Sequence, residues 1–516
     1  MTLVHHFLEE QARARPDHEL LVLHEPGAAR LSYAQVDAAA NRMARLLRDC
    51  GARKGDRIAI LAHNGIEYVA TWFAALKLGA IAVPVNTATD PTSLAHVIED
   101  AGARLLVVGP RLERVVVQAG ERLVGLGAIL TAGAPAARQA IAKAVGDASV
   151  VPLADADGLA AEPVDAAIDP GDPAAIIYTS GSTGRPRGAT LSHRALVTNT
   201  RSIVAYLGLA ADDRVGVVLP FHYVYGKSLL TTATAVGATL VVENRFQYPA
   251  TALDTLEREK CTGFAGVPST FAILVHRAGL ANRALPDLRW VTQAGGGMSP
   301  ALTRALIDAL PGRRIHVMYG ATEASARLAH LPPEELAEAI GSIGRAIPDV
   351  ELTVRRPDGT PCDIDEDGEL FARGDNLMTG YWNDPDETAR VLGPYGYATG
   401  DLARRDAAGR LWLVGRKKDL LKVGGHRVAS REIEDAIAEH PGVLEVAVVG
   451  VPDELLGDRL VAFLVLRDGH ALDPTALGAF LKDRIAGYKI PHTVEIQADL
   501  PHNAAGKIMK DRLRPH

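Results

Sequence analysis

Cysteine is scarce in this sequence, with only Cys50, Cys261 and Cys362 among 516 residues. The three lie far apart, and no two have the Cys-x-x-Cys spacing of a metal site or redox pair. This scarcity excludes a disulfide framework and favours reduced thiols in a reducing compartment. The N-terminus also lacks a basic segment followed by an apolar core, so we expect no signal peptide and a soluble, cytoplasmic protein.

Excess basic charge is lacking as well. Lys and Arg number 55 against 62 Asp and Glu, a net charge of −7, so the footprint of a nucleic-acid-binding protein is absent. One stretch, residues 68–85, resembles a membrane span because it carries a single charge, Lys77. Lys77 and Gly79 interrupt it and Pro84 lies near its end, so we expect a buried helix followed by a buried strand and no membrane span.

The length predicts two to four folding units, and no repeat of 20–50 residues is present. Helix and strand signals alternate in the first half. A capping box at residues 32–35 begins one helix, and the apolar run at residues 58–61 predicts a buried strand. This alternation predicts an α/β fold in which mostly parallel sheets are flanked by helices. Residues 119–169 are rich in Ala, Gly and Pro and predict a variable surface stretch.

The last hundred residues have a different pattern. Ser430 precedes a helical pattern, two strand-like runs follow at residues 446–449 and 460–466, and Asp473 caps another helix. These signals predict a small α+β unit. Because the stretch before it is charged and contains glycine, as linkers are, we expect a large domain over residues 1–417 and a small domain over residues 418–516.

A glycine-rich loop at residues 179–188 is the strongest local motif. It follows an apolar strand at residues 174–177 and precedes a helix that Ser192 can cap. Its glycines allow backbone N–H groups to converge on an anion, and its hydroxyls and arginines add donors and charge. Its spacing matches neither the Walker loop nor the dinucleotide fingerprint. We therefore expect a triphosphate-binding loop made by Thr179, Ser180, Gly181, Ser182, Thr183, Gly184 and Arg187.

Six further motifs follow in order. They occupy residues 219–226, 293–300, 318–323, 399–401, 415–419 and 503–507. Together with the loop they resemble the adenylate-forming superfamily of acyl-CoA synthetases, peptide-synthetase adenylation domains and luciferases. One departure is Arg187, which stands where that family usually has lysine; it keeps the charge and adds a planar fork.

The resemblance implies a two-step ligase. A carboxylate attacks the α-phosphate of ATP to give acyl-adenylate and pyrophosphate, with Mg²⁺ required, and a thiol, most often that of CoA, then displaces AMP. The alternative acceptors are a carrier-protein phosphopantetheine, an amine or an amino acid. Because a carboxylate is already ionised at pH 7, the first step needs charge neutralisation more than a base.

The resemblance also assigns roles to single residues. Lys507 bridges the carboxylate and the α-phosphate, Glu323 holds Mg²⁺, and Asp401 accepts the ribose hydroxyls. The catalytic set is Lys507, His222, Thr322 and Glu323. The adenine and ribose set is Gly295, Gly296, Gly297, Met318, Tyr319, Gly320, Asp401 and Arg416.

An acyl pocket follows from the same resemblance, with His222 as its gate. Its lining set is His222, Tyr223, Val224, Gly226, Val267, Gly295, Gly320 and Ala321. Adenylation domains for α-amino acids usually place Asp where this chain has Tyr223, and an unpaired ammonium in an apolar pocket would be costly. We therefore expect a non-amino carboxylic acid: aliphatic, alicyclic or aryl.

The small domain is expected to be mobile. In the family it rotates between the two half-reactions, with Lys418 as the hinge and Gly424 and Gly425 reaching the thiol tunnel. Two other classes are disfavoured. A hydrolase would need a Gly-x-Ser-x-Gly elbow, which is absent, and a binding-only sensor has no use for Lys507.

Overall fold

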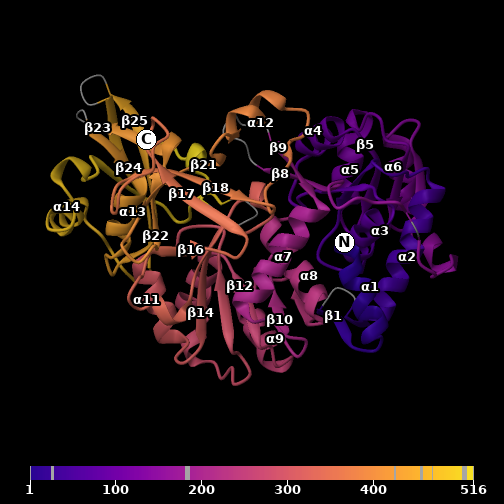
Figure 1. The fold of residues 1–516 in the computed structure, drawn as a ribbon. Helices are drawn as coiled ribbons and strands as arrows, with labels where there is room; N and C mark the ends of the chain where they lie inside the picture. Colours follow the sequence, from indigo (N-terminus) through magenta and orange to yellow (C-terminus); the bar gives the residue numbers. More distant parts are fainter. Residues whose placement is uncertain are drawn as a thin grey trace.

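The computed structural model describes the chain except for Met1 and residues 25–27, 165, 180–185, 424–425, 454–456, 468, 503–507 and 515–516. The described residues form two large sheets with their helices, followed by a smaller unit that carries the C-terminus (Figure 1). The predicted α/β class with a small α+β unit is confirmed.

The first sheet has eight described strands in the order β19-β9-β8-β4-β3-β5-β6-β7. Their bounds are β3 Arg57–Leu61, β4 Ile81–Pro84, β5 Ala103–Val108, β6 Ala128–Thr131, β7 Ser149–Pro152, β8 Pro173–Thr179, β9 Arg187–Ser192 and β19 Gly380–Tyr381. The strands from β8 to β7 are parallel, and β9 and β19 are antiparallel additions. Helices associated with this part are α2 Tyr33–Asp49, α3 Ile66–Lys77, α4 Pro91–Ala101, α5 Glu113–Ala119 and α6 Pro135–Ala144.

Several local predictions are confirmed here. Ser32 caps α2 in a capping box, and residues 68–85 form the buried helix α3 and strand β4. The prediction for residues 119–169 is wrong, because β6, α6 and β7 lie there and extend the sheet. These elements are short and separated by turn residues, so their periodic signal is weak.

The second sheet has fourteen described strands, in the order β17-β18-β21-β22-β16-β15-β14-β13-β12-β10-β11-β1-β2, with β20 beside β21. Its N-terminal strands are β1 Glu19–His24, β2 Ala29–Ser32, β10 Arg214–Val217, β11 Thr239–Glu243, β12 Gly263–Gly266, β13 Trp290–Gln293 and β14 Arg314–Tyr319. The later strands are β15 Ala329–Leu331, β16 Ser342–Ala346, β17 Val350–Arg355, β18 Gly368–Gly374, β20 Leu392–Gly393, β21 Gly396–Arg405 and β22 Leu411–Arg416. Strands β11 to β14 are parallel, whereas the pairs beyond β14 are antiparallel.

Helices pack around this sheet and between the two sheets. They are α1 Val4–Ala14, α7 His193–Leu207, α8 Val224–Val236, α9 Pro249–Arg258, α10 Pro268–His276, α11 Pro300–Ala309 and α12 Pro385–Val391. Helices α7 and α8 lie between the sheets (Figure 1). One continuous core joins side chains of both sheets, such as Ile58 and Val215, to α3 and α8.

The small unit has its own sheet and core. Strands β23 Leu420–Val423, β24 His426–Ala429, β25 Val443–Asp453, β26 Gly457–Leu466 and β27 Thr493–Ile496 pack with α13 Ser430–Ala438 and α14 Pro474–Lys482. Its core includes Ile433, Ile437 and Leu477. The predicted boundary at residue 418 lies between β22 and β23 and stays a prediction.

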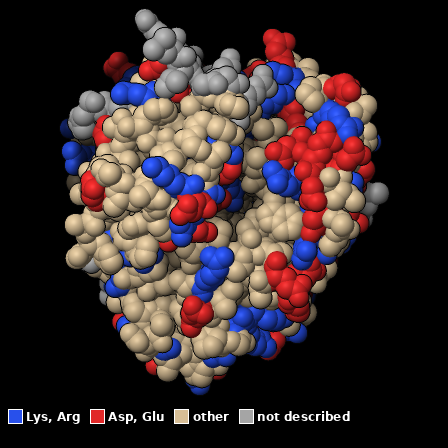
Figure 2. Space-filling model, turned by 90° about the vertical axis from the view of Figure 1, so that its left-hand side faces the viewer, with Lys and Arg blue, Asp and Glu red and all other residues tan. Residues whose placement is uncertain are grey.

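Figure 2 shows the face on which the small unit lies. On the described part of this face, acidic and basic side chains lie next to one another around a recess near the centre of the view. Among the described helices, none has both the length and the apolar character that a membrane crossing requires.

Candidate active site

The ends of the phosphate loop are fixed by an antiparallel strand pair. Thr179 at the end of β8 lies opposite Arg187 at the start of β9. The predicted helix with Ser192 as its cap is confirmed as α7, and a strand that was not predicted, β9, lies between the loop and this helix. The predicted phosphate ligands Ser180, Gly181, Ser182, Thr183 and Gly184 lie outside the described residues.

Arg187 is anchored where the loop returns to the sheet. Its Nη1 lies 2.8 Å from Glu387 Oε1 and its Nε lies 3.3 Å from Asp384 Oδ2. The guanidinium carbon also lies 6.0 Å from the centre of the Tyr381 ring. The two carboxylates hold the positive charge at the loop exit, next to α12.

The glycine segment after β13 is accessible to solvent. Gly295, Gly296 and Gly297 are exposed, and the Gln293 side chain donates to the Gly296 carbonyl at 2.8 Å. Gly297 is covered on one side by the small unit, because a Cβ there would lie 2.5 Å from Arg431 Nη2 of α13. A nucleotide base can therefore approach this backbone without meeting a side chain of the segment itself.

The wall of the predicted acyl pocket forms beside it. Gly295 has a φ of +84°, and a Cβ there would lie 3.0 Å from Val267 Cγ1 and 3.8 Å from the Tyr223 hydroxyl. The structure thus brings Tyr223, Val267 and Gly295 together. Gly226 serves packing, because a Cβ there would lie 2.1 Å from the Pro220 carbonyl oxygen.

Asp401 forms the best-defined charged centre. Its carboxylate accepts the Tyr319 hydroxyl at 2.5 Å and lies 2.9 Å from Arg416 Nε. Strand register creates this pair, because Asp401 and Arg416 are opposite each other in β21 and β22, next to a bulge that places Leu402 opposite Gly415 and Ala403 opposite Leu413. The charge of Asp401 raises the pKa of Arg416, and burial with that charge raises the pKa of Tyr319, so the phenol stays a donor.

Glu323 is held by a segment from elsewhere in the chain. It lies in the short turn Thr322–Ala324, half-buried, and Oε1 accepts the Tyr381 hydroxyl at 2.7 Å. The Met378 N–H donates to the Glu323 carbonyl at 2.7 Å. Burial and the charge of Glu323 raise the pKa of Tyr381, which therefore stays protonated. Thr322, beside Glu323, is buried.

The loop that follows Glu323 is strained and tightly fixed. Ser325 and Ala326 have φ angles of +58° and +132°, conformations that cost about 1–3 kcal/mol each. The Asn376 amide donates to the carbonyls of Ala324 and Arg327 at 3.2 and 3.0 Å. Strain that the surroundings hold in place is typical of a functional loop.

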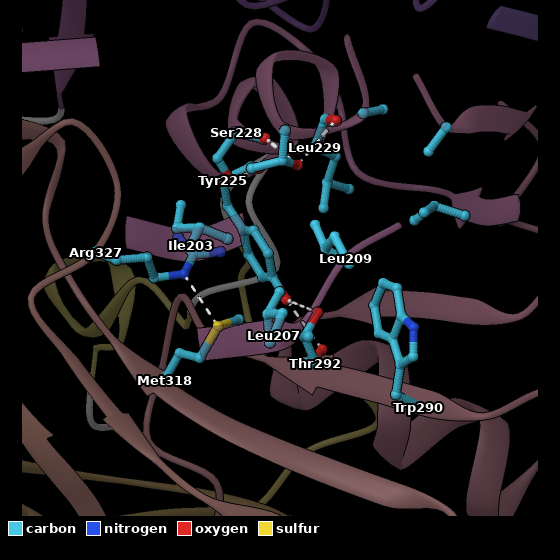
Figure 3. Close-up of a pocket in the computed structure, with 14 residues that line it drawn as sticks. Ile203, Leu207, Leu209, Tyr225, Ser228, Leu229, Trp290, Thr292, Met318 and Arg327 are labelled. Carbon is cyan, nitrogen blue, oxygen red and sulfur yellow. Dashed lines mark hydrogen bonds between the residues drawn. The ribbon is translucent and has the colours of Figure 1, made fainter. Parts of the chain in front are cut away.

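A small internal pocket lies beneath this loop (Figure 3). The Arg327 guanidinium carbon lies 4.0 Å from the centre of the Tyr225 ring, and its Nε lies 3.4 Å from Met318 Sδ. The pocket holds about 10 Å³, room for one water at most. Met318, predicted at the adenine site, lines this pocket and is buried. The pocket is too small for an organic acid and acts as packing below the site.

His222 lies just before α8 on a fixed main chain. The Phe221 carbonyl accepts the Tyr68 hydroxyl at 2.7 Å, and the Phe221 N–H donates to Asn64 Oδ1 at 2.7 Å. Burial, followed by the charges of Lys227 and a second histidine, lowers the pKa of His222 to about 3. The imidazole is therefore neutral at pH 7.

The predicted groups share one electrostatic environment. Burial raises the pKa of Tyr397, and the charges of Glu323 and Asp401 raise it further. Burial also raises the pKa of Tyr223, which Arg416 lowers and Glu323 raises. The metal, ribose and acyl parts of the prediction therefore lie around one site.

Some predicted residues are not placed, and others were missed. Lys507, Gly424 and Gly425 lie outside the described residues, and Lys418 belongs to the turn Lys417–Asp419. The missed contacts are those of Tyr381, Asp384, Glu387 and Arg431. They join segments far apart in sequence, so no local spacing could indicate them.

Two family matches cover most of the chain. Residues 8–382 match the AMP-binding enzyme family, and residues 432–507 match the AMP-binding enzyme C-terminal domain. The chain belongs to the AMP-binding enzyme family. The resemblance inferred from the seven motifs is therefore confirmed.

Relatives of this AMP-binding enzyme extend over nearly its whole length. It is 33% identical to a feruloyl-CoA synthase of Amycolatopsis sp over 506 residues, covering 98% of this chain and 97% of the relative. It is also 33% identical to an indoleacetate–CoA ligase of Aromatoleum aromaticum over 490 residues, covering 94% and 92%.

Solved structures of similar enzymes match over both units. The anthranilate CoA ligase AuaEII with anthranoyl-AMP has a TM-score of 0.90 at 26% identity, covering 99% and 96% of the two chains. The o-succinylbenzoate CoA synthetase of Bacillus subtilis with ATP and a magnesium ion has a TM-score of 0.84 at 27% identity, covering 98% of each chain. The amide bond synthetase McbA of Marinactinospora thermotolerans has a TM-score of 0.86 at 26% identity, covering 99% of each.

Proposed function

We propose that this AMP-binding enzyme activates a non-amino carboxylic acid with Mg·ATP and transfers the acyl group to the thiol of CoA. The observation that carries the proposal is the Asp401 centre. Its carboxylate, bonded to Tyr319 and Arg416, lies in one electrostatic cluster with Glu323, beside the bare glycine backbone of residues 295–297. This is the arrangement that a nucleotide with ribose, base and phosphates needs.

ATP binding follows from these groups. Asp401 uses one oxygen for Tyr319 and one for Arg416, and each oxygen retains a lone pair for a ribose hydroxyl. The triphosphate extends from there toward the loop between Thr179 and Arg187, whose glycines and hydroxyls supply donors.

The residues present fit a magnesium ion. Glu323 offers a half-buried carboxylate whose Oε2 accepts no hydrogen bond from a described residue, and Mg²⁺ prefers one or two carboxylates together with phosphate oxygens. Glu323 would hold the ion, with the buried Thr322 as its neighbour in the chain. When bound, Mg²⁺ neutralises phosphate charge.

Adenylation then needs alignment more than proton transfer. The substrate carboxylate attacks the α-phosphorus of ATP, the bond to the β-phosphate oxygen breaks, and pyrophosphate leaves. Lys507 holds the carboxylate and the α-phosphate together by its positive charge. His222 directly precedes Tyr223 of the acyl wall, and its imidazole is neutral. An acid that enters there therefore does not have to desolvate a charged imidazolium.

The acid class follows from the wall. Tyr223, Val267 and Gly295 present a phenol and apolar surface, without a carboxylate to pair an ammonium group. Aryl and aliphatic acids fit this surface. CoA as acceptor is supported by relatives that are CoA ligases, whereas McbA, an amide bond synthetase, supports the alternative of an amine acceptor.

Product analysis over an acid panel tests the proposal. Purified protein is incubated with ATP, Mg²⁺ and aryl, alicyclic and aliphatic acids, and pyrophosphate release is measured. AMP and acylated product are then compared with CoA, an amine or a carrier protein as acceptor. We expect pyrophosphate with at least one acid and thioester with CoA; amide formation without thioester would favour the alternative, and no pyrophosphate with any acid would refute the proposal.

Lys507→Ala separates the two steps. Adenylation should fall steeply, whereas thioester formation from supplied acyl-adenylate should persist, because a thiol attack on the adenylate needs no group to align ATP. Equal loss in both steps would contradict the role of Lys507.

A further inference from the structure

Among the described residues, Tyr381 makes the only hydrogen bond to the Glu323 side chain. Its hydroxyl donates to Oε1 at 2.7 Å. Three residues earlier, the Met378 N–H holds the Glu323 carbonyl. One short segment therefore fixes both the main chain and the carboxylate of Glu323.

Tyr381 is itself fixed from two sides. It lies on β19, which pairs with β9 so that Tyr381 is opposite Ala189. The Thr388 hydroxyl of α12 accepts the Tyr381 N–H at 2.8 Å. Because the ring cannot shift along the strand, its hydroxyl reaches Glu323 from a defined direction.

Strand β19 also meets the exit of the phosphate loop. Trp382 N–H donates to the Gly188 carbonyl at 2.7 Å, one residue after Arg187. Arg187 lies over the Tyr381 ring and is held by Glu387. Tyr381 thus connects Glu323 to the loop exit, although Glu323 lies 135 positions after Gly188 in the sequence.

We propose that Tyr381 is a positioning residue that orients the Glu323 carboxylate toward the magnesium ion of Mg·ATP and fixes that carboxylate relative to Arg187 and Gly188 at the exit of the phosphate loop. The inference rests on the proposed function. With Oε1 held by the phenol, Oε2 is left for the ion. Hydrogen bonds to metal ligands typically change metal affinity by about 10–100-fold when removed.

Tyr381→Phe tests this directly. Mn²⁺ is titrated into enzyme that is in excess over a non-hydrolysable ATP analogue, and free Mn²⁺ is followed by electron paramagnetic resonance. We expect the apparent Mn²⁺ dissociation constant to rise by about tenfold. In pyrophosphate exchange the half-saturating Mg²⁺ concentration should rise by the same factor, while activity at saturating Mg²⁺ recovers to nearly the wild-type value.

Tyr178→Phe is the matched control. Tyr178 also donates to a carboxylate, Asp100 Oδ2 at 2.5 Å, and lies on β8 opposite Gly188, but no contact joins it to Glu323. It should leave Mn²⁺ affinity unchanged. An equal loss in both variants, or wild-type Mn²⁺ affinity in Tyr381→Phe, would overturn the inference.

A double variant isolates the pair. In a Glu323→Gln background, Tyr381→Phe should cause no further change in Mn²⁺ affinity, because the shared interaction is already lost. Additive losses would overturn the inference. The Mn²⁺ titration needs no acid substrate, so a failure to activate any acid and a failure of this inference give different results.

Discussion

The candidate active site (the cleft) and the helices α3 and α8 (the helical layer) differ in how their charged side chains are partnered. In the cleft, charges persist and are paired: Asp401 with Arg416, and Arg187 with Glu387. In the helical layer, Lys227 of α8 is fully buried, and no ion pair joins it to a described carboxylate. Its Nζ lies 3.6 Å from the centre of the Trp72 ring, and burial lowers its pKa well below the ordinary value.

The difference reflects what each region does. A pocket for a triphosphate needs ionised groups that are already oriented, and partners keep them ionised. In a packed layer, burial disfavours the charged form, so the pKa of a basic group without a carboxylate partner falls. Lys77 of α3 is the exception in this layer, because Glu9 and Asp37 lie 2.6 and 2.9 Å from its Nζ.

Removing the charge of Asp401 should have the largest effect. Asp401→Asn removes the negative charge that strengthens the two proposed hydrogen bonds from the ribose hydroxyls of ATP. At about 2 kcal/mol for each bond, kcat/KM for ATP should fall by about 1000-fold. Pyrophosphate release at varied ATP measures it. Asp406→Asn, which loosens the pair with Arg410 at the other end of the same hairpin, should stay close to wild type. Similar losses in both variants would show that the hairpin, not the nucleotide contact, matters.

Lys77→Met should destabilise the fold by about 3 kcal/mol, because it leaves two mostly buried carboxylates without a cation. Urea unfolding measures the loss. Lys54→Met is the exposed counterpart, since Lys54 pairs with Asp172 at 2.8 Å near solvent, and should cost under about 1 kcal/mol. An equal loss of stability in the two variants would show that the buried ion pairs of Lys77 contribute no more than the exposed pair of Lys54.

His193 predicts an acid-sensitive layer. It is fully buried, and burial lowers its pKa to about 4, whereas the unfolded value is about 6.5. Between these values the unfolded chain binds a proton that the folded chain does not, so stability is complete above about pH 6.5 and is lost as the pH falls. From pH 7 to pH 5 wild type should lose about 2 kcal/mol more than His193→Gln in urea unfolding. Parallel pH dependences would contradict the neutral assignment.

Lys227→Met should have the smallest effect, within about 1 kcal/mol of wild type at pH 7, because a buried lysine without a carboxylate contributes little net stability. Since the lysine is protonated in the unfolded chain up to about pH 10.4, wild-type stability should rise relative to Lys227→Met as the pH increases toward that value. A large loss in the free energy of unfolding at pH 7 would mean that Lys227 stabilises the fold as a charged group, as Lys77 does.

The sequence alone predicts the helices, strands and caps that depend on local side-chain patterns. Ser32 and its capping box, and the helix and strand at residues 68–85, follow from side-chain spacing alone. The motifs placed Asp401 and Arg416 in one site only through family resemblance. Their actual pairing depends on register between β21 and β22, which neither local segment encodes by itself.

The elements and contacts that were not predicted have two causes. Strand β9 was hidden because a cap at Ser192 gives the same signal whether a strand or a loop precedes it. Tyr381 and Glu387 act across about 60 and 200 residues on Glu323 and Arg187, so their roles appear only when the chain is folded. Such contacts are set by tertiary packing and not by propensity.

The bulge in β22 leaves one residue of that strand without a partner in β21. Val414 is the extra residue that lets both Leu402 face Gly415 and Ala403 face Leu413. Deleting Val414 would remove this unpaired residue and make the ladder regular, with Asp401 still opposite Arg416, and would take away the additional twist that a bulge gives to its strand. Because such a deletion keeps the ion pair, a loss of ATP binding in this variant would mean that ribose recognition depends on the curvature of the hairpin as well as on the two charged side chains.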